Sequence, residues 1–234
     1  AGHFKYNVEI PKFFDTKVSQ STSLPYYFNI AEDKELTFTP TINYGGGVDS
    51  SQRFTFEYNQ LISGGSLSSD LTVDSKFEAQ NYNKWFTDAS LITNFNKNIN
   101  AKFSINFDSA FETSKNYIQT TNPNNELSYT SSLATKMNLN GYNLRKIDDK
   151  LLVNFSAYQT NQNNDDNSSI PTVLPYIEYK SGIFKYKKYD YQNQFEFYNI
   201  FRDKKTSDNA KEQQKLSHNL FFSKKYIDFN SNII

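Results

Sequence analysis

Few residues in this sequence have the types and spacing that catalysis requires. The chain contains two histidines, His3 and His218, and no cysteine. A Ser-His-Asp arrangement assembles in space and therefore stays open, but the sequence has no G-x-S-x-G elbow, H-E-x-x-H pair or P-loop. His218 alternates with Leu216 and Leu220, which indicates a strand residue rather than a catalytic base. An enzyme is therefore the least favoured interpretation.

Sites for metals and phosphates are weakly indicated as well. Gly45–Gly47 is not followed by the strand-to-helix context of a phosphate loop, which favours a flexible hairpin loop. Asp165 and Asp166 lie in the Asn-rich stretch Asn161–Ser169 and fit a solvated loop tip better than a cation site. The lack of cysteine excludes disulfides and Cys-based metal sites. We expect neither a metal nor a cofactor.

The elements that would position any site are strands. The chain has 234 residues, of which 17% are aromatic and 37% hydrophobic, and its polar part is rich in Asn, Ser and Thr. Phe, Tyr, Ile and Thr suit pleated strands, whereas Asn, Ser, Thr and Asp compete with helical hydrogen bonds. Basic and acidic residues balance at 25 each without a strongly basic stripe, so a nucleic-acid partner is not expected. No apolar run approaches the roughly 20 residues of a transmembrane helix.

Alternation of apolar and polar residues runs along most of the chain. Leu36, Phe38, Pro40 and Ile42 fall on one face of such a segment, with threonines on the other. We predict about eleven strands and no helix. The alternating segments are 18–30, 35–43, 52–60, 65–74, 84–95, 99–107, 127–139, 150–159, 172–180, 188–201 and 215–226.

The connections between these segments alternate between short and long. The short ones are Ala31–Lys34, Ile62–Gly65 and Asn96–Asn98, and the long ones are Tyr44–Ser51, Ser75–Asn83, Thr113–Glu126, Asn161–Ser169 and Asp203–Gln214; Asn140–Asp149 departs from the rhythm. Outer-membrane barrels have short turns at one end and long loops at the other. The sequence thus predicts an all-β, antiparallel, up-and-down transmembrane β-barrel that is only partly contained in this chain. A soluble β-sandwich explains the polar faces equally well.

Polar residues on the alternating segments are candidates for a wet lumen. Asp70, Lys102 and Lys136 are the charged residues that we expect to face it. Pro25 and Pro40 fall within the first two strand-like runs, where proline cannot donate to a ladder. They mark either a deliberately loosened region of sheet or a strand end or bulge.

Several motifs resemble one known family. Leu24–Ala31 reads L-P-Y-Y-F-N-I-A and is followed by Leu36–Pro40, L-T-F-T-P. Downstream lie Gly64–Asp70, G-G-S-L-S-S-D, and Pro171–Tyr179, P-T-V-L-P-Y-I-E-Y. In this order they resemble the barrel of the lipopolysaccharide-assembly family LptD, also called organic solvent tolerance protein. The resemblance covers about residues 8–180. Glu35 departs from the family's common aspartate, the turn after Ala31 lacks the usual proline, and Thr113–Ile118 only approximates the family's S-D-x-x-Y segment.

The resemblance implies a location and a role. Residues 1–17 would be the junction after a missing periplasmic jelly-roll domain, and residues 18–234 the N-terminal portion of the barrel in the cell outer membrane. The whole protein would insert lipopolysaccharide into the outer leaflet through a lateral gate, with Pro25 and Pro40 as gate residues. Its partners would be an LptE-like plug lipoprotein and a periplasmic lipopolysaccharide-transport bridge. Another outer-membrane porin or channel is the alternative, followed by a soluble β-sandwich binding protein.

Overall fold

The computed structural model describes residues 7–8, 19–45, 51–76, 88–122, 124–161, 166–202, 212–224 and 227–233. In these ranges the strands pair in chain order as an antiparallel, up-and-down sheet of 13 strands, with two further short strands paired alongside. The sheet does not close into a ring within the described ranges. The predicted all-β, up-and-down architecture is therefore confirmed, whereas barrel closure and membrane insertion stay predictions. No helix among these residues is long and apolar enough to span a membrane.

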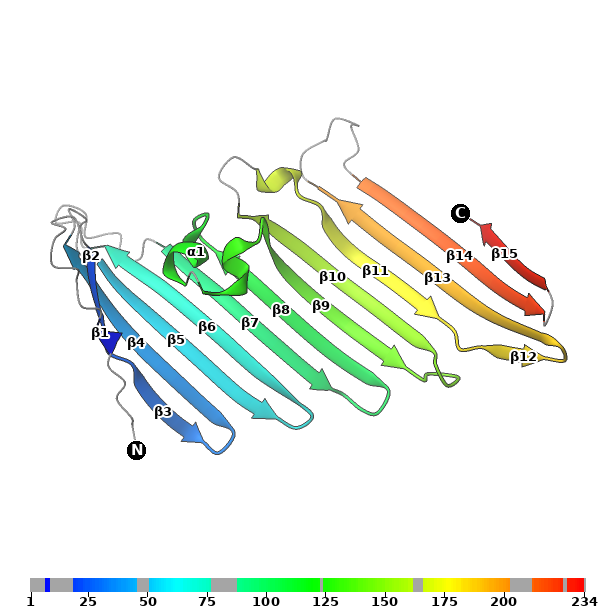
Figure 1. Cartoon of the computed structure of the whole chain (residues 1–234), viewed down its shortest axis with the longest axis horizontal. Coiled ribbons are helices and arrows are strands. Elements are labelled where there is room, and N and C mark those ends of the chain that lie inside the picture. Colours follow the sequence, from blue (N-terminus) through cyan, green and yellow to red (C-terminus); the bar gives the residue numbers. More distant parts are fainter. Residues whose placement is uncertain are drawn as a thin grey trace. The chain divides into compact units, whose positions relative to one another are not determined.

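The chain divides into two compact units, the first made of residues 1–94 and 109–130. Its strands form a meander in which β3 pairs with β4 beside β2 (Figure 1). It contains β1 (Asn7–Val8), β2 (Ser19–Ser23), β3 (Tyr26–Ala31), β4 (Lys34–Gly45), β5 (Ser51–Ile62), β6 (Gly65–Lys76), the first part of β7 (Asp88–Asn98), the last part of β8 (Phe103–Glu112), α1 (Tyr117–Thr121) and the 3-10 helix η1 (Glu126–Tyr129).

The second unit consists of residues 95–108 and 131–234 and is also a meander. β12 is a short strand that pairs with β13 beside β11. The unit contains the remaining parts of β7 and β8, β9 (Ser132–Tyr142), β10 (Lys150–Thr160), the 3-10 helix η2 (Asn167–Ser169), β11 (Thr172–Lys180), β12 (Phe184–Tyr186), β13 (Tyr189–Phe201), β14 (Glu212–Lys224) and β15 (Ile227–Ile233).

The sheet of the first unit has one apolar face that the described residues leave open. The register aligns Tyr26, Phe38, Phe56 and Leu71 in one row across β3 to β6, and the rings of Phe38 and Phe56 lie 4.9 Å apart. The Leu71 side chain at the end of this row is exposed. Because successive strand side chains alternate between faces, the intervening residues form a polar face.

The sheet of the second unit also has one apolar and one polar face. A row of Leu139, Val153, Ile177, Phe197 and Leu216 crosses β9 to β14 on one face. The terminal member of this row, Leu216, is 56% exposed, so this apolar face is open as well. Only four hydrophobic side chains are buried among all the described residues. The apolar residues therefore line a sheet surface and do not fill a core between two layers.

The strand count and some boundaries differ from the sequence prediction. The described residues form fifteen strands and not about eleven, because β1, β12 and β15 are additional and the segment 18–30 is divided. Leu24 and Pro25 separate β2 from β3. The predicted junction 1–17 and the N-terminal part of segment 84–95 lie largely outside the described residues.

The predicted strand 99–107 begins too early and the predicted turn Asn96–Asn98 is wrong. β7 continues through Asn98, and the turn occupies residues 99–102. The cause is the side chain of Asn100, whose Oδ1 accepts hydrogen bonds from the N–H groups of Lys102 at 2.8 Å and Phe103 at 3.0 Å. Asparagine commonly stabilises a turn in this way.

The expectation that the chain has no helix is also wrong. The predicted strand 127–139 begins instead at Ser132, because Leu127 and Tyr129 belong to η1. The Asn125 side chain caps this helix by accepting a hydrogen bond from the Leu127 N–H at 2.9 Å. A capping residue of this kind overrides a pattern that continues the alternation of β9.

Candidate functional site

Both predicted gate prolines lie at one point of the pairing of β2 and β3 with β4. We call this the edge pairing, because within the described residues only the two-residue strand β1 lies beyond it. The register is the same on both sides of the break between β2 and β3, so Leu24 faces Pro40 and Pro25 faces Thr39. The Leu24 N–H donates a hydrogen bond to the Pro40 carbonyl at 3.1 Å. We call these four residues the proline seam.

The proline seam lacks one ladder hydrogen bond, and the missing bond belongs to the pairing of β2 and β3 with β4. A strand residue directs its N–H and its C=O to the same neighbouring strand. Because the Pro40 carbonyl faces Leu24, the missing Pro40 N–H removes a bond to Leu24 and none to β5. Pro25 points its nitrogen away from β4 by the same rule. A net contribution of about 1 kcal/mol is therefore missing from the edge pairing, while β4 pairs with β5 from Lys34 to Asn43.

The two prolines occupy different positions in the sheet. Pro25 stands at the break before β3, as a strand-end proline would. Pro40 lies inside the twelve-residue strand β4, on its edge-facing side. Both obey the rule that proline in a sheet avoids positions whose N–H is needed by a central ladder.

The polar face of the first unit carries an ion pair covered by a helix. Arg53 binds Asp74 in a two-pronged arrangement, with Nε–Oδ1 at 2.8 Å and Nη2–Oδ2 at 3.1 Å. Tyr117 of α1 buries its hydroxyl beside this pair, although no hydrogen bond of good geometry reaches the oxygen. Burial and the negative charge of Asp74 raise the pKa of Tyr117. The loop after β8 thus folds over the polar face.

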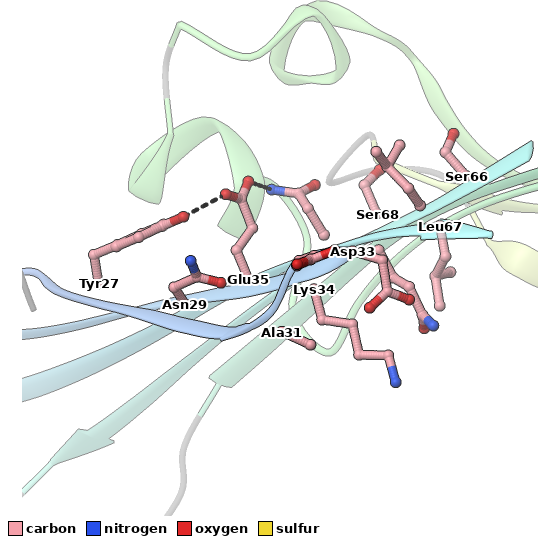
Figure 2. A pocket seen from close by; sticks show the side chains of 13 residues that line it. Tyr27, Asn29, Ala31, Asp33, Lys34, Glu35, Ser66, Leu67 and Ser68 are labelled. Carbon is pink, nitrogen blue, oxygen red and sulfur yellow. Dashed lines mark hydrogen bonds between the residues drawn. The ribbon is translucent and has the colours of Figure 1, made fainter. Parts of the chain in front are cut away.

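A pocket with a volume of about 380 Å³ lies near the turns of β3–β4 and β5–β6. Figure 2 shows Tyr27 directed toward Glu35, to which its hydroxyl donates at 2.8 Å. The other carboxylate oxygen of Glu35 accepts from the Asn59 amide at 3.2 Å. Two more acids, Glu32 and Asp33, line the pocket. Lys34, Leu61 and Leu67 also line it, so the wall is mixed in character, and the Glu35 carboxylate is held by Tyr27 and Asn59.

The three predicted lumen residues have different surroundings. Asp70 stands on the polar face of the first unit, opposite Glu57 in the β5–β6 ladder. Lys136 stands on the polar face of the second unit, with its Nζ 5.7 Å from the centre of the Tyr158 ring. Lys102 lies in the turn between β7 and β8, where its Nζ donates to the Leu144 carbonyl at 3.1 Å. The structure therefore brings Asp70 and Lys136 to polar sheet faces and puts Lys102 at a strand end.

The polar face of the second unit holds a hydrogen-bonded group that the sequence pattern did not single out. Glu178 of β11 lies opposite Glu196 of β13. Glu178 accepts from the Tyr176 hydroxyl at 3.1 Å and from the Gln194 amide at 3.2 Å, and Glu196 accepts from Ser217 at 3.3 Å. Alternation alone placed these residues on a polar face, but only the register between strands brings them together.

A second group that sequence reasoning missed is centred on Asp149, at the end of the long connection before β10. Its buried carboxylate accepts from the backbone N–H groups of Gly182 at 2.5 Å, Lys146 at 2.9 Å and Arg145 at 3.0 Å. Burial by itself raises the pKa of Asp149, but these bonds and the Tyr179 hydroxyl hold it below its ordinary value. We call this group the Asp149 latch. The unusual length of its loop was the only signal in the sequence.

The remaining sequence candidates form no reactive group. His218 lies on β14 with Nε2 3.3 Å from Asn193 Oδ1, whereas His3 and Asp165 lie outside the described residues. Gly45 ends β4, and Gly46 and Gly47 are likewise outside them. Asp166 accepts from Ser168 at the start of η2. Within the described ranges no group of three or more His, Asp or Glu residues could hold a metal ion.

Comparisons with known proteins leave the family undecided. No family model matches this sequence, and no curated protein matches it either. The assignment of a role therefore depends on the geometry of the sheet and on the motifs of the sequence.

Proposed function

We propose that this chain is the N-terminal portion of an outer-membrane β-barrel that inserts lipopolysaccharide into the outer leaflet. The observation that carries the membrane part of this proposal is the open apolar face. In the second unit it runs from Leu139 to Leu216 across five strands of 9–13 residues. A tilted strand needs about 9–11 residues to cross a bilayer. On the opposite face of this unit, Glu178 and Glu196 accept hydrogen bonds from neighbouring polar side chains, an arrangement that a wet lumen permits.

The proline seam supports lateral release in particular. Lipopolysaccharide that leaves a barrel sideways requires a place where strand pairing is weak enough to open. Pro40 removes one hydrogen bond from the pairing of β2 and β3 with β4 and leaves the β4–β5 ladder intact, and Pro25 stands at the break between β2 and β3. The role involves transport without bond making. An LptE-like plug lipoprotein and a periplasmic bridge belong to the proposal as partners of the whole protein.

A different outer-membrane channel is the second candidate, and the charged polar face favours it. Arg53 and Asp74 form an ion pair on the face that would line the lumen, and α1 folds over that pair. Loops that fold into the lumen narrow or plug several barrels. A β-sandwich is disfavoured because the described strands belong to one sheet whose apolar face is open.

The deciding experiment depletes the full-length protein in its Gram-negative host and measures lipopolysaccharide at the cell surface and in the periplasmic fraction. We expect surface lipopolysaccharide to fall and internal lipopolysaccharide to accumulate. Rescue by the wild-type gene serves as the positive control, and the level of an unrelated outer-membrane porin controls for general envelope damage. Unchanged export of lipopolysaccharide on full depletion would overturn the assembly role and favour the channel.

A further inference from the structure

Basic residues gather at one end of the second unit, on the connections between β7 and β8, between β9 and β10, and between β11 and β13. We define the turn surface as residues 97–102, 142–150 and 180–190. These segments contain nine basic and three acidic residues, a net charge of +6, although the whole chain is neutral. The rest of the chain therefore carries a net charge of −6. The basic residues of the turn surface are Lys97, Lys102, Arg145, Lys146, Lys150, Lys180, Lys185, Lys187 and Lys188.

Side-chain contacts join the three segments into one surface, at the end of the second unit where β12 lies (Figure 1). Lys102 reaches the second segment by donating to the Leu144 carbonyl at 3.1 Å. Lys146 reaches the third by donating to the Ile183 carbonyl at 3.2 Å, and the Asp149 latch binds Gly182. The cations are thus held on a connected surface and not on three independent loops.

The positive charge of this surface is poorly compensated from within. Lys150 lies directly opposite Lys180 in the β10–β11 ladder, and both side chains are exposed. Like charges at opposed ladder positions destabilise the pair. The Asp149 carboxylate accepts hydrogen bonds from backbone N–H groups, and no ion pair joins it to a lysine or arginine side chain among the described residues. An external anion at this place would relieve the repulsion between the two lysines.

Exposed apolar side chains stand between these cations. Ile147 is 79% exposed and Tyr186 is 63% exposed, and Lys187 places its Nζ 5.5 Å from the centre of the Tyr186 ring. Ile99, Tyr142 and Ile183 are also exposed. Isolated aliphatic and aromatic groups among lysines suit the boundary between lipid headgroups and acyl chains. An acidic protein partner fits this surface less well, because it would have to cover each of these separate apolar groups to remove them from water.

We propose that the turn surface binds the anionic headgroups of phospholipids in the leaflet that it adjoins. The inference rests on the membrane-spanning part of the proposed function, because only strands that cross the bilayer bring the turn surface at their ends to the level of the headgroups. It does not depend on the transport of lipopolysaccharide. Basic residues close to an anionic membrane surface each strengthen binding about fivefold, equivalent to about 1 kcal/mol.

The test uses the full-length protein in a non-ionic detergent. Binding of dioctanoyl-phosphatidylglycerol and of dioctanoyl-phosphatidylcholine is measured by calorimetric titration at low and high salt. The wild type should bind the phosphatidylglycerol at least tenfold more tightly, and salt should reduce this preference. The triple variant Lys185→Gln, Lys187→Gln, Lys188→Gln should lose at least fivefold in affinity. The variant Lys150→Gln, Lys180→Gln provides a second reduction of charge at a different part of the surface.

A matched control removes three positive charges elsewhere in the chain. Lys115→Gln, Arg202→Gln, Lys215→Gln changes the net charge equally and should leave the affinity for phosphatidylglycerol within twofold of the wild type. Equal losses in this control and in the turn variants would overturn the proposal, because general charge would then explain binding. Equal binding of the two lipids would also overturn it, as would full competition by inorganic phosphate or tighter binding of polyglutamate.

The two proposals fail separately. Absence of lipid preference, with loss of surface lipopolysaccharide on depletion, would sink only the headgroup site. A clear preference for phosphatidylglycerol with unchanged lipopolysaccharide export would sink only the assembly role.

Discussion

Replacing Pro40 by valine should strengthen the proline seam at one identifiable amide. Valine restores the N–H that faces the Leu24 carbonyl, and its β-branched side chain suits the apolar face of β4. One added backbone hydrogen bond contributes about 1 kcal/mol net, which corresponds to roughly fivefold fewer openings of the edge pairing. Residue 40 remains paired with β5 while the edge pairing opens. The larger conformational entropy of valine therefore does not offset the gain in pairing energy.

The assay is amide hydrogen exchange of the Leu24 N–H, which donates to the carbonyl of residue 40. Exchange in Pro40→Val should be about fivefold slower than in the wild type, on the energy just given. Pro25→Val is the matched control, because the nitrogen of residue 25 points away from β4 and its new N–H cannot bond across the seam. The reasoning is refuted if Pro40→Val leaves Leu24 exchange unchanged, or if Pro25→Val slows it equally.

Four further predictions concern the latch and the ion pair. Asp149→Asn should lower the free energy of unfolding by about 2 kcal/mol, because the amide offers one acceptor oxygen to three donors that now meet a carboxylate. Denaturant unfolding measures this loss, and Asp148→Asn serves as the control. Because the fold lowers the Asp149 pKa, the contribution of this carboxylate to stability should be complete above about pH 4 and lost as the pH falls through its pKa in the folded protein. Exchange of the Gly182 amide, corrected for its intrinsic rate, should show this pH dependence in the wild type and not in Asp149→Asn. Gly182→Ala should loosen the same loop, because a Cβ there would collide with the Ile147 carbonyl; equal protease sensitivity of both proteins at residues 143–149 would contradict it. Tyr117→Phe should be neutral or stabilising by up to about 1 kcal/mol, since it removes a buried hydroxyl that has no hydrogen bond. Arg53→Met should destabilise the fold by roughly 1–3 kcal/mol, because it leaves Asp74 without its cation. Thermal unfolding of both variants should show opposite or clearly unequal changes in melting temperature.

The sequence predicted the strands well wherever alternation ended at a turn residue. The segment 172–180 agrees with β11 at both ends, and 150–159 agrees with β10 to within one residue. Prediction failed where a side chain interrupts the backbone without interrupting the pattern. Asn100 folds the chain into a turn although Ile99 and Phe103 continue the alternation, and Asn125 caps a helix in the same manner.

The candidate sites were less accessible to sequence reasoning because they depend on register. Alternation identified Asp70 and Lys136 as polar-face residues, but it could not pair Glu178 with Glu196 or Lys150 with Lys180. The Asp149 latch joins residues 33 positions apart, Asp149 and Gly182. Such contacts follow from how neighbouring strands are aligned, and a one-residue shift in that alignment would move every side chain to the opposite face.

The exact position of Pro40 within β4 determines which strand pairing is weakened. At residue 39 or residue 41 a proline would remove a bond from the β4–β5 ladder, because N–H groups of alternate residues face that strand. At residue 40 it removes a bond only from the edge pairing, and Pro25 lies one step along the same pairing without adding a second loss to it. Two prolines near the same break therefore weaken one strand boundary by a single hydrogen bond and leave the next boundary complete. A sheet that must open on one side and hold on the other requires this distribution, and this is why the seam supports a lateral gate more strongly than the presence of two prolines alone would.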